Sequence, residues 1–254
     1  MDVLVCIKRV PAPGGKVLLS ADGTSIDTRH LGFTIGPHEE CAVEEAVRIV
    51  AEHGGSTTVL TAGPPEADEQ LRYALSMGAD HGVLVETGTR ELDPQATATA
   101  LTEAIRLLES ESKPFDLVLF GNETADAGHY QVGVRVSRAL GLPIVGGIKG
   151  IEIGTGRVSL QRDVADGVEV YDAPLPAAAA VKEGLNLPRY PSIKGRLRAK
   201  KSPVRTIRPE PSPGGLRTVR LRRPPEKEHE TVVLGYGAEA AGAVVDVLAE
   251  KGLV

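Results

Sequence analysis

Short apolar runs alternate with amphipathic stretches over the first two-thirds of the chain. The amphipathic stretches repeat apolar residues at steps of three and four, which is typical of helices, whereas the short runs favour strands. Strands that alternate with helices in this way predict parallel βαβ units in one doubly wound, mostly parallel α/β sheet. The expected strands are residues 3–7, 57–61, 82–85 and 115–120, and the expected helices are residues 39–53, 66–77, 94–108 and 130–140.

The pattern changes after Leu142-Pro143, where the helical periodicity stops. Further apolar runs follow, and turn signals at Gly154, Gly156 and Asp166-Gly167 separate them. Short strands joined by tight turns predict antiparallel additions to one edge of the sheet. These expected strands are residues 144–153, 156–164, 167–171 and 177–181.

The segment from Val181 to Lys201 predicts a stiff, non-helical arm. Pro188 and Pro191 fix their own φ and push the residues before them into extended conformations. The centre of the arm carries one aliphatic residue, Ile193, and its far end is basic. An apolar tip inside a basic collar suits docking onto an acidic partner with a small hydrophobic pocket. The alternative is an ordinary interdomain linker with a solvated charge run. The basic residues are Lys194, Arg196, Arg198, Lys200 and Lys201.

The last quarter of the chain predicts a tail. Residues 205–225 are rich in Pro and Arg and cannot form a core of their own, so we expect them to wrap around another surface. A helix is expected over residues 238–251. The expected organisation is therefore an α/β nucleotide-binding body at 1–185, a partner-recognition arm at 186–201, and an extended tail with a C-terminal helix at 202–254.

Composition removes several classes of partner. The net charge of −5 argues against nonspecific nucleic-acid binding, so the basic arm is a local exception in an acidic protein. Trp is absent and aromatic residues make up 3%, so the stacking surface of single-strand nucleic-acid binders is missing. The amino terminus enters an apolar run without a cleavable targeting segment, and no window approaches the roughly 18 apolar residues that span a bilayer. We expect a cytoplasmic protein with no nucleic-acid partner and no direct membrane insertion.

In an open α/β sheet, ligands bind beyond the carboxyl ends of the strands. The strongest candidate there is the loop after the strand that ends at Phe120, because it contains Gly121 and Gly128 and runs into a helix near Gln131. Glycines allow close approach of the backbone, and free N–H groups at a helix start attract phosphate. The alternative is a tight strand-to-helix turn, since no GxGxxG or GxxxxGK[ST] pattern is present.

Few other residues suggest chemistry. Cys6 and Cys41 lack metal-ligand spacing, and we expect reduced thiols, one in a strand and one on a helix. No nucleophile elbow, Cys/His dyad or zinc-binding histidine spacing is present, so we expect no catalytic residue and no metal ligand. His38 and His129 fall in the proposed nucleotide loops and could contact a phosphate or base. The other histidines, expected to be solvated or capping, are His30, His53, His81 and His229.

Several motifs together resemble one family. The arm carries Asn186-x-Pro188-Arg189-Tyr190, then Ile193, and then Ala199-Lys200-Lys201. Over roughly residues 1–201, this order and spacing are similar to those of the electron-transfer flavoprotein β subunits. That resemblance implies the adenine-nucleotide-hydrolase-like version of the doubly wound fold. The other matching motifs are Lys8-Arg9-Val10, Ala42 to Ala46, Ala74 to Asp80, Gly121 to Gly133, and Asp166 to Glu169.

The resemblance implies an AMP that serves structure. Two departures stand out: the family usually has Asn-Pro where this chain has Gly36-Pro37, and Gly-Lys-Gln-x-x-Asp where it has Gly121 to Asp126. Glu123 would be unfavourable beside a phosphate unless it faces ribose hydroxyls. The residues that match the family's AMP contacts are Cys6, Gly36, Pro37, His38, Glu39, Ala62, Gly121, Asn122, Glu123, Thr124, Ala125, Asp126, Ala127, Gly128, His129, Tyr130, Gln131 and Val132.

The resemblance also implies partners. The chain would be an electron-carrier subunit, not an enzyme in its own right, with FAD held mainly by an α subunit. Electrons would come from acyl-CoA dehydrogenases or related flavoenzymes, as in fatty acid oxidation, and leave to a quinone reductase. The residues expected to dock the dehydrogenase are Pro188, Arg189, Tyr190, Ile193, Lys194, Arg196 and Arg198.

Two other functions remain open. Electron-bifurcating relatives bind a second FAD in place of AMP, and their β subunits resemble Lys-x-Val-Pro-Asp-Thr near the start, whereas this chain has Lys8-Arg-Val-Pro-Ala-Pro13. This difference favours AMP. A stand-alone nucleotide-binding sensor uses the same architecture, but it has no evident need for the arm and the tail.

Overall fold

The computed structural model describes residues 1–88, 91–210, 212–225 and 231–254. Met1–Val219 form one compact unit, and Arg220–Val254 form a second, smaller one. His229 and parts of the predicted tail, residues 211 and 226–230, lie outside the described residues.

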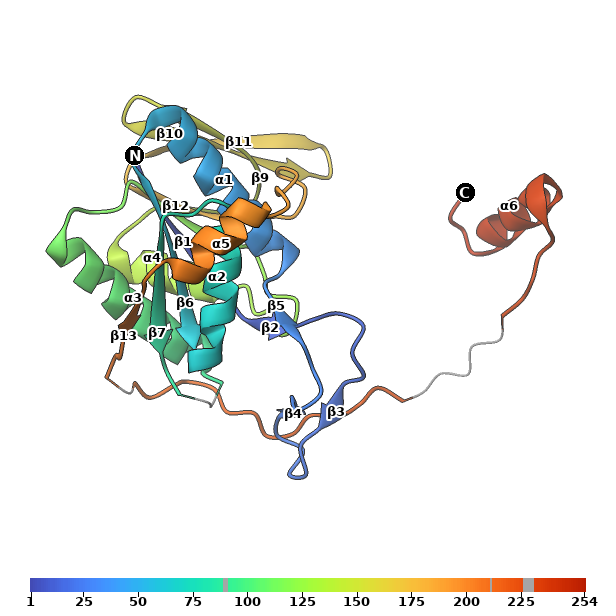
Figure 1. Cartoon of the computed structure of the whole chain (residues 1–254). Coiled ribbons are helices and arrows are strands. Elements are labelled where there is room, and N and C mark those ends of the chain that lie inside the picture. Colours follow the sequence, from blue (N-terminus) through green and yellow to red (C-terminus); the bar gives the residue numbers. More distant parts are fainter. Residues whose placement is uncertain (89–90, 211, 226–230) are drawn as a thin grey trace. The chain divides into compact units, whose positions relative to one another are not determined.

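A nine-stranded sheet, counted over the described residues, organises the first unit (Figure 1). Starting from one edge, seven neighbouring strands run parallel, and an antiparallel hairpin of two strands completes the other edge. The doubly wound, mostly parallel α/β fold is therefore confirmed. From edge to edge, the strands are β11 (Gly167–Pro174), β10 (Arg157–Val164), β9 (Ile144–Gly154), β12 (Ala177–Val181), β8 (Leu117–Gly121), β1 (Asp2–Ile7), β6 (Ser56–Gly63), β7 (His81–Glu86) and β13 (Val204–Ile207).

Helices cover both faces of this sheet, which explains why its central strands are continuously apolar. Alternate residues of β1 belong to two separate cores: Val3 and Val5 pack with α1 and α2, whereas Leu4 and Cys6 pack with α3 and α4. The third helix on the α1 side is α5, which packs against α2. The helices are α1 (Pro37–His53), α2 (Asp68–Met77) and α5 (Ile193–Lys201) on one face, and α3 (Pro94–Glu111) and α4 (Val132–Leu140) on the other.

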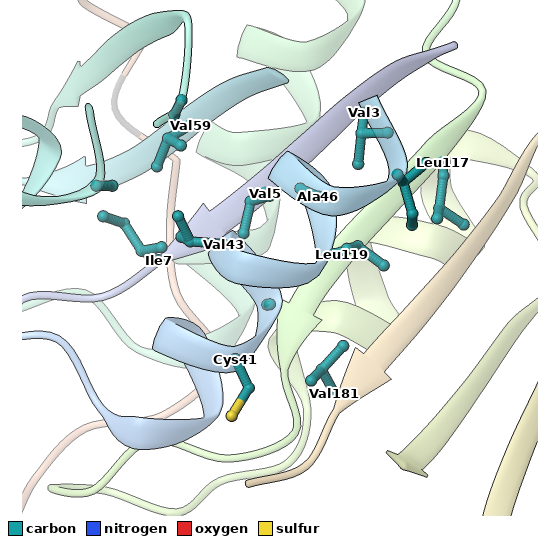
Figure 2. Packing of buried hydrophobic residues seen from close by; sticks show 14 of the residues in the cluster. Val3, Val5, Ile7, Cys41, Val43, Ala46, Val59, Leu117, Leu119 and Val181 are labelled. Atoms are coloured by element: carbon teal, nitrogen blue, oxygen red, sulfur yellow. The ribbon is translucent and has the colours of Figure 1, made fainter. Parts of the chain in front are cut away.

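Helix α1 lies over the centre of the sheet (Figure 2). Its residues Cys41, Val43 and Ala46 are buried against side chains of β1 and β8, including Val5 and Leu119. Cys6 and Cys41 are both free and buried, one in a strand and one on a helix, as the sequence predicts.

The predicted antiparallel edge is confirmed for β9, β10 and β11 and wrong for β12. β10 is antiparallel to both β9 and β11, whereas β12 lies inside the described sheet, parallel to both β8 and β9. Every residue of β12 is buried, because helices or other parts of the chain cover both of its faces. Four alanines followed by Val181 leave room for this coverage, whereas β11 keeps a largely exposed edge.

The predicted tail begins as part of the body. β13 pairs in parallel with β7, from Val204 opposite Gly82 to Ile207 opposite Val85, and forms the other edge of the sheet. A four-residue strand with two exposed members carries too short a pattern to be recognised along the sequence.

The second half of the predicted non-helical arm is the helix α5. Ser192 caps its start, since its side-chain hydroxyl accepts a hydrogen bond from the N–H of Gly195 at 3.0 Å. Pro188 and Pro191 precede the cap, so their conformational restriction ends before the helix begins.

Smaller elements complete the fold. Two short antiparallel pairs, β2 with β5 and β3 with β4, lie between β1 and α1. The second unit contains η2 and α6, which together overlap the C-terminal helix predicted over residues 238–251. No helix in the described residues is long and apolar enough to cross a bilayer. The bounds are β2 (Val10–Pro11), β3 (Leu18–Leu19), β4 (Ile26–Asp27), β5 (Phe33–Thr34), η1 (Pro65–Ala67), η2 (Gly237–Ala240) and α6 (Ala241–Glu250).

Candidate functional site

The carboxyl ends of β8, β1 and β6 lie side by side at one edge of the sheet. Cys6 near the end of β1 is in register with Leu60 of β6 and Phe120 of β8, and all three strands are parallel. The segments that follow them must therefore leave from the same edge. A direct contact confirms this, because the Lys8 ammonium after β1 lies 2.6 Å from a carboxylate oxygen of Asp126 in the loop after β8.

The loop after β8 and the start of α1 enclose a cleft of about 400 Å³. This volume falls in the range of roughly 300–1,000 Å³ that is usual for small-molecule sites. Two segments that the sequence assigned to nucleotide binding are thus brought together from positions far apart in the chain. The residues that line the cleft are Pro37, His38, Glu123, Thr124, Ala125, Asp126, Ala127 and Gly128.

Backbone N–H groups are available in this loop. The amides of Glu123, Thr124, Ala125 and Asp126 donate no hydrogen bond to any residue that the structure describes. The loop closes on itself where the N–H of Gly128, at φ +54°, bonds to the carbonyl of Thr124 at 3.0 Å. Successive free amides in a turn form a concave surface that favours an anion.

Lys8 and two carboxylates form an ion cluster beside the cleft. Its ammonium group lies 2.6 Å from Asp126 and 2.9 Å from Glu91. Burial opposes ionisation of Asp126, but the hydrogen bond and charge of Lys8 outweigh it, so the pKa of Asp126 is lowered. Lys8 is therefore already paired, and the loop amides are left as the groups best placed to meet a phosphate.

His38 connects the start of α1 with two other segments. Its Nδ1 accepts a hydrogen bond from the N–H of Glu183 at 3.3 Å, and its Nε2 lies 3.6 Å from a carboxylate oxygen of Glu123. Because Nδ1 is an acceptor, the proton of the neutral ring belongs on Nε2, where it faces Glu123. This contact gives Glu123 a partner inside the cleft wall.

Glu39 explains one departure from the family pattern. Its side chain is 2% exposed, and its Oε2 has no hydrogen-bond partner within the described residues. A Cβ atom on Gly36 would lie 2.5 Å from this oxygen, and one on Gly121 would lie 2.9 Å from the carboxyl carbon. Glycine at position 36 therefore makes room for the Glu39 carboxyl. Burial raises the pKa of Glu39 to about 7, with Asp126 adding to the shift and Lys8 opposing it.

The remaining predicted contacts do not line the cleft. Asn122 supports the sheet, because its Oδ1 accepts a hydrogen bond from the N–H of Gly147 at 2.7 Å. Cys6 is buried, and burial raises the pKa of its thiol. Tyr130 is exposed and has φ +57°, an uncommon conformation outside glycine. The other predicted residues outside the lining are Gly36, Glu39, Ala62, Gly121, His129, Gln131, which is the N-cap of α4, and Val132, which begins it.

The arm before α5 is tied to α1. The Arg189 guanidinium donates two hydrogen bonds to the Glu44 carboxylate, at 2.7 and 3.0 Å, and Glu44 is buried. Asn186 donates to the carbonyl of Cys41 at 3.0 Å and to Glu45 at 2.8 Å. Arg189, expected at the docking surface, is thus a tether, and sequence patterns could not reveal its partner because it lies 145 residues away.

Helix α5 is fixed on α2 through backbone carbonyl groups. Arg198 donates to the carbonyl of Leu75 at 2.9 Å, and Arg72 donates to the carbonyl of Ala199 at 2.8 Å. Each arginine thereby satisfies a carbonyl at the C-terminal end of the opposite helix. The helices approach closely, since a Cβ on Gly195 would lie 2.5 Å from the carbonyl oxygen of Ser76. Arg198 therefore supports α5 as well as adding positive charge.

Three large side chains remain outside these contacts. Tyr190, Ile193 and Leu197 are 83%, 79% and 59% exposed. Ile193 and Leu197 are one helical turn apart, so the apolar tip has two aliphatic residues. Leu197 was not predicted as part of the tip, because a non-helical arm does not bring it beside Ile193. Arg196 donates to the Tyr190 hydroxyl at 2.9 Å, and Lys194 is exposed beside it. Pro188 is half-buried at the base of the arm.

No group of three or more His, Cys, Asp or Glu residues in the described ranges could hold a metal ion.

The family assignment rests on comparison with known proteins. Residues 24–212 match the family described as electron transfer flavoprotein domain. An electron transfer flavoprotein subunit beta from Bacillus subtilis is 32% identical over 263 aligned positions, with all of both chains covered.

Two other relatives support the same assignment. An electron transfer flavoprotein subunit beta from Syntrophomonas wolfei is 36% identical over 229 positions, which cover 89% of this chain and 87% of the relative. Protein FixA from Sinorhizobium fredii is 32% identical over 208 positions, covering 80% and 73%. The fold defines a doubly wound α/β protein with a cleft at the carboxyl edge of its sheet and a basic helix, α5, on one face. The chain belongs to the electron transfer flavoprotein family, and its similarity to the β subunits extends over its whole length.

Proposed function

We propose that the chain is the β subunit of a cytoplasmic, heterodimeric electron carrier whose α subunit holds most of the FAD. It would receive electrons from acyl-CoA dehydrogenases or related flavoenzymes and pass them to a quinone reductase. The observation that carries this proposal is the docking surface of Tyr190, Ile193 and Leu197, which is exposed although its backbone is firmly held. Such a surface suits repeated encounters with other proteins.

AMP fits the cleft between α1 and the loop after β8. The free amides of Glu123 to Asp126 offer donors for a phosphate, and the carboxylates of Glu123 and Asp126 offer acceptors for ribose hydroxyls. Its volume of about 400 Å³ is adequate for a nucleoside monophosphate. AMP in this chain would hold the loop against α1 without taking part in turnover.

The flavin supplies the redox chemistry, and this chain supplies position and charge. Arg72 and Arg198 already fix the backbone of α5, the recognition helix of this proposal, and Arg189 fixes the segment before it. Little conformational entropy would therefore be lost on docking. Ile193 and Leu197 would enter an apolar pocket on the dehydrogenase. Lys194 and Arg196 would steer its acidic rim into contact.

Cofactor content tests this proposal. The chain would be co-expressed with an electron transfer flavoprotein α subunit from the same genome, and nucleotides released by acid would be quantified. About one FAD and one AMP per heterodimer are expected. Two FAD and no AMP would contradict the single-carrier function and favour an electron-bifurcating subunit. A lone chain that forms no complex and carries only ATP or AMP would favour a nucleotide-binding sensor.

A further inference from the structure

One carboxylate joins the start of α3 to a distant part of the chain. Oδ1 of Asp93 accepts a hydrogen bond from the N–H of Ala96 at 2.8 Å and thereby caps α3. Its Oδ2 accepts from the N–H groups of Gly215 and Leu216 at 2.7 and 2.6 Å. The two groups of donors are more than 100 residues apart in the chain, so capping alone does not account for this arrangement.

The tail comes so close to Asp93 that a side chain at either of two glycines would have to displace a side chain of the body. A Cβ on Gly214 would lie 2.5 Å from Oδ1 and 2.7 Å from Cγ of Asp93. A Cβ on Gly215 would lie 2.7 Å from Oε1 of Gln95. The Gly-Gly pair therefore allows both amides to reach the carboxylate.

This contact is the second anchor of the tail on the body. The first is β13, which pairs with β7 and is followed by an ion pair between Arg208 and Glu86 at 2.9 Å. The residues directly after the second anchor, 217–220, are exposed. Asp93 and Gly215 also line a cavity of about 260 Å³ that reaches Gln131 and Arg135 of the α4 region.

The electrostatic environment keeps this contact intact at neutral pH. Burial opposes ionisation of Asp93, but the hydrogen bonds from the Ala96, Leu216 and Gly215 amides outweigh it, and the charge of Arg135 acts in the same direction. The pKa of Asp93 is therefore lowered. A charged carboxylate makes stronger hydrogen bonds to amides than a neutral group does.

We propose that Asp93 is a positioning residue, a latch that holds residues 214–216 on the body and fixes where the tail leaves toward a partner subunit. This inference rests on the proposed function, in which the tail wraps around the α subunit. Without the latch, the free part of the tail would begin near Arg208 instead of Leu216. The longer free segment would have to be ordered during assembly, which opposes binding.

Two variants open the latch from opposite sides. Asp93→Asn keeps one carbonyl oxygen to cap α3, because Asn is as good an N-cap as Asp, but it offers an NH₂ group where Gly215 and Leu216 need an acceptor. Gly214→Ala leaves Asp93 unchanged and places a methyl group against its carboxylate. The control is Gly242→Ala, at a tail glycine whose added Cβ would meet nothing within 4 Å.

Hydrogen exchange on the full chain and affinity for the co-expressed α subunit are the two measurements. Both latch variants should speed exchange of the Gly215 and Leu216 amides, leave α3 protected, and weaken α-subunit binding by about tenfold. The double variant should weaken it no further, since both changes break one contact. The control should match the wild type.

Faster exchange with unchanged α-subunit affinity would overturn the positioning role, and so would unchanged exchange in both variants. If α3 lost protection in Asp93→Asn but not in Gly214→Ala, the effect of Asp93→Asn would come from the lost cap. The exchange and the α-subunit affinity of Gly214→Ala would then test the positioning role. A wild-type chain that binds no α subunit would instead refute the proposed function.

Discussion

The cleft and helix α5 leave opposite kinds of group available. In the cleft, side chains are largely paired with one another, as in Lys8 with Asp126 and His38 with Glu123, and backbone amides are left available. In the arm, backbone and guanidinium groups are paired, and the side chains of Tyr190, Ile193 and Leu197 are left exposed.

This difference fits what each region would recognise under the proposed function. A phosphate is small and charged, so converging amides suit it, and fixed side chains keep them in place. A protein partner that is released after electron transfer would be large, and exposed aliphatic and aromatic groups on a prearranged helix would suit it. The two regions should therefore fail independently, and variants can test that expectation.

The largest effect is expected from breaking the cleft. Asp126→Ala removes a partner of Lys8, and Gly128→Val places a β-branched residue at φ +54°, which is strained. Together these changes should reduce bound nucleotide by roughly a hundredfold and weaken assembly, because the loop can no longer close. Nucleotide content after acid release would be measured.

A matched control lies in the turn between β3 and β4. Asp22→Ala with Gly23→Val removes a hydrogen-bonded aspartate and strains a glycine at φ +68°, far along the chain from the cleft loop. This control should retain the nucleotide. If the cleft variant also retained it with full occupancy, the loop would be no more than a tight strand-to-helix turn.

The next effect concerns the buried acid behind the cleft. The pKa of Glu39 is raised to about 7, so the folded protein favours the protonated carboxyl more than the unfolded chain does. The free energy of unfolding should therefore fall as pH rises from about 4.5 to about 7. Glu39→Gln cannot ionise, so it should escape this loss. Between pH 4.5 and pH 8, the difference in free energy of unfolding between variant and wild type should therefore shift in favour of the variant by up to roughly 3 kcal/mol. Urea unfolding at both pH values measures this.

Glu52→Gln is the control, because Glu52 is an exposed residue of the same helix. Its free energy of unfolding should differ from that of the wild type by the same small amount at both pH values. An equally pH-independent difference for Glu39→Gln would show that Glu39 titrates as an ordinary carboxyl group.

The smallest effect is expected from removing the tip of the recognition helix. Ile193→Ala should slow electron transfer from an acyl-CoA dehydrogenase by about tenfold, as expected for a docking residue, while flavin and nucleotide contents stay unchanged. Stopped-flow flavin reduction at varied dehydrogenase concentration separates docking from transfer. Leu107→Ala on α3, across the sheet from α5, is the control. Equal rates for both variants would remove Ile193 as an anchor.

Much of the site could be predicted because parallel strands place their following loops at one edge. Residues 36–39 and 121–128 were expected at one nucleotide site, and Pro37, His38 and residues 123–128 line one cleft beyond the strand ends. The roles of Arg189 and Arg198 could not be predicted. Basic residues in an apparent linker suggest solvent or a partner. Glu44 and Leu75 become their partners only after the arm lies against α1 and α5 packs on α2.

The sequence by itself determined the helices and central strands, the edge of the sheet where the cleft lies and the place of the arm, since each depends on local periodicity or chain order. Tertiary structure decided that β12 enters the sheet, that β13 extends it, that α5 forms on α2, and that Asp93 receives Gly215. These features depend on contacts between residues far apart in the chain. Short segments carry too little local preference to specify such contacts, and burial against the completed body makes the choice.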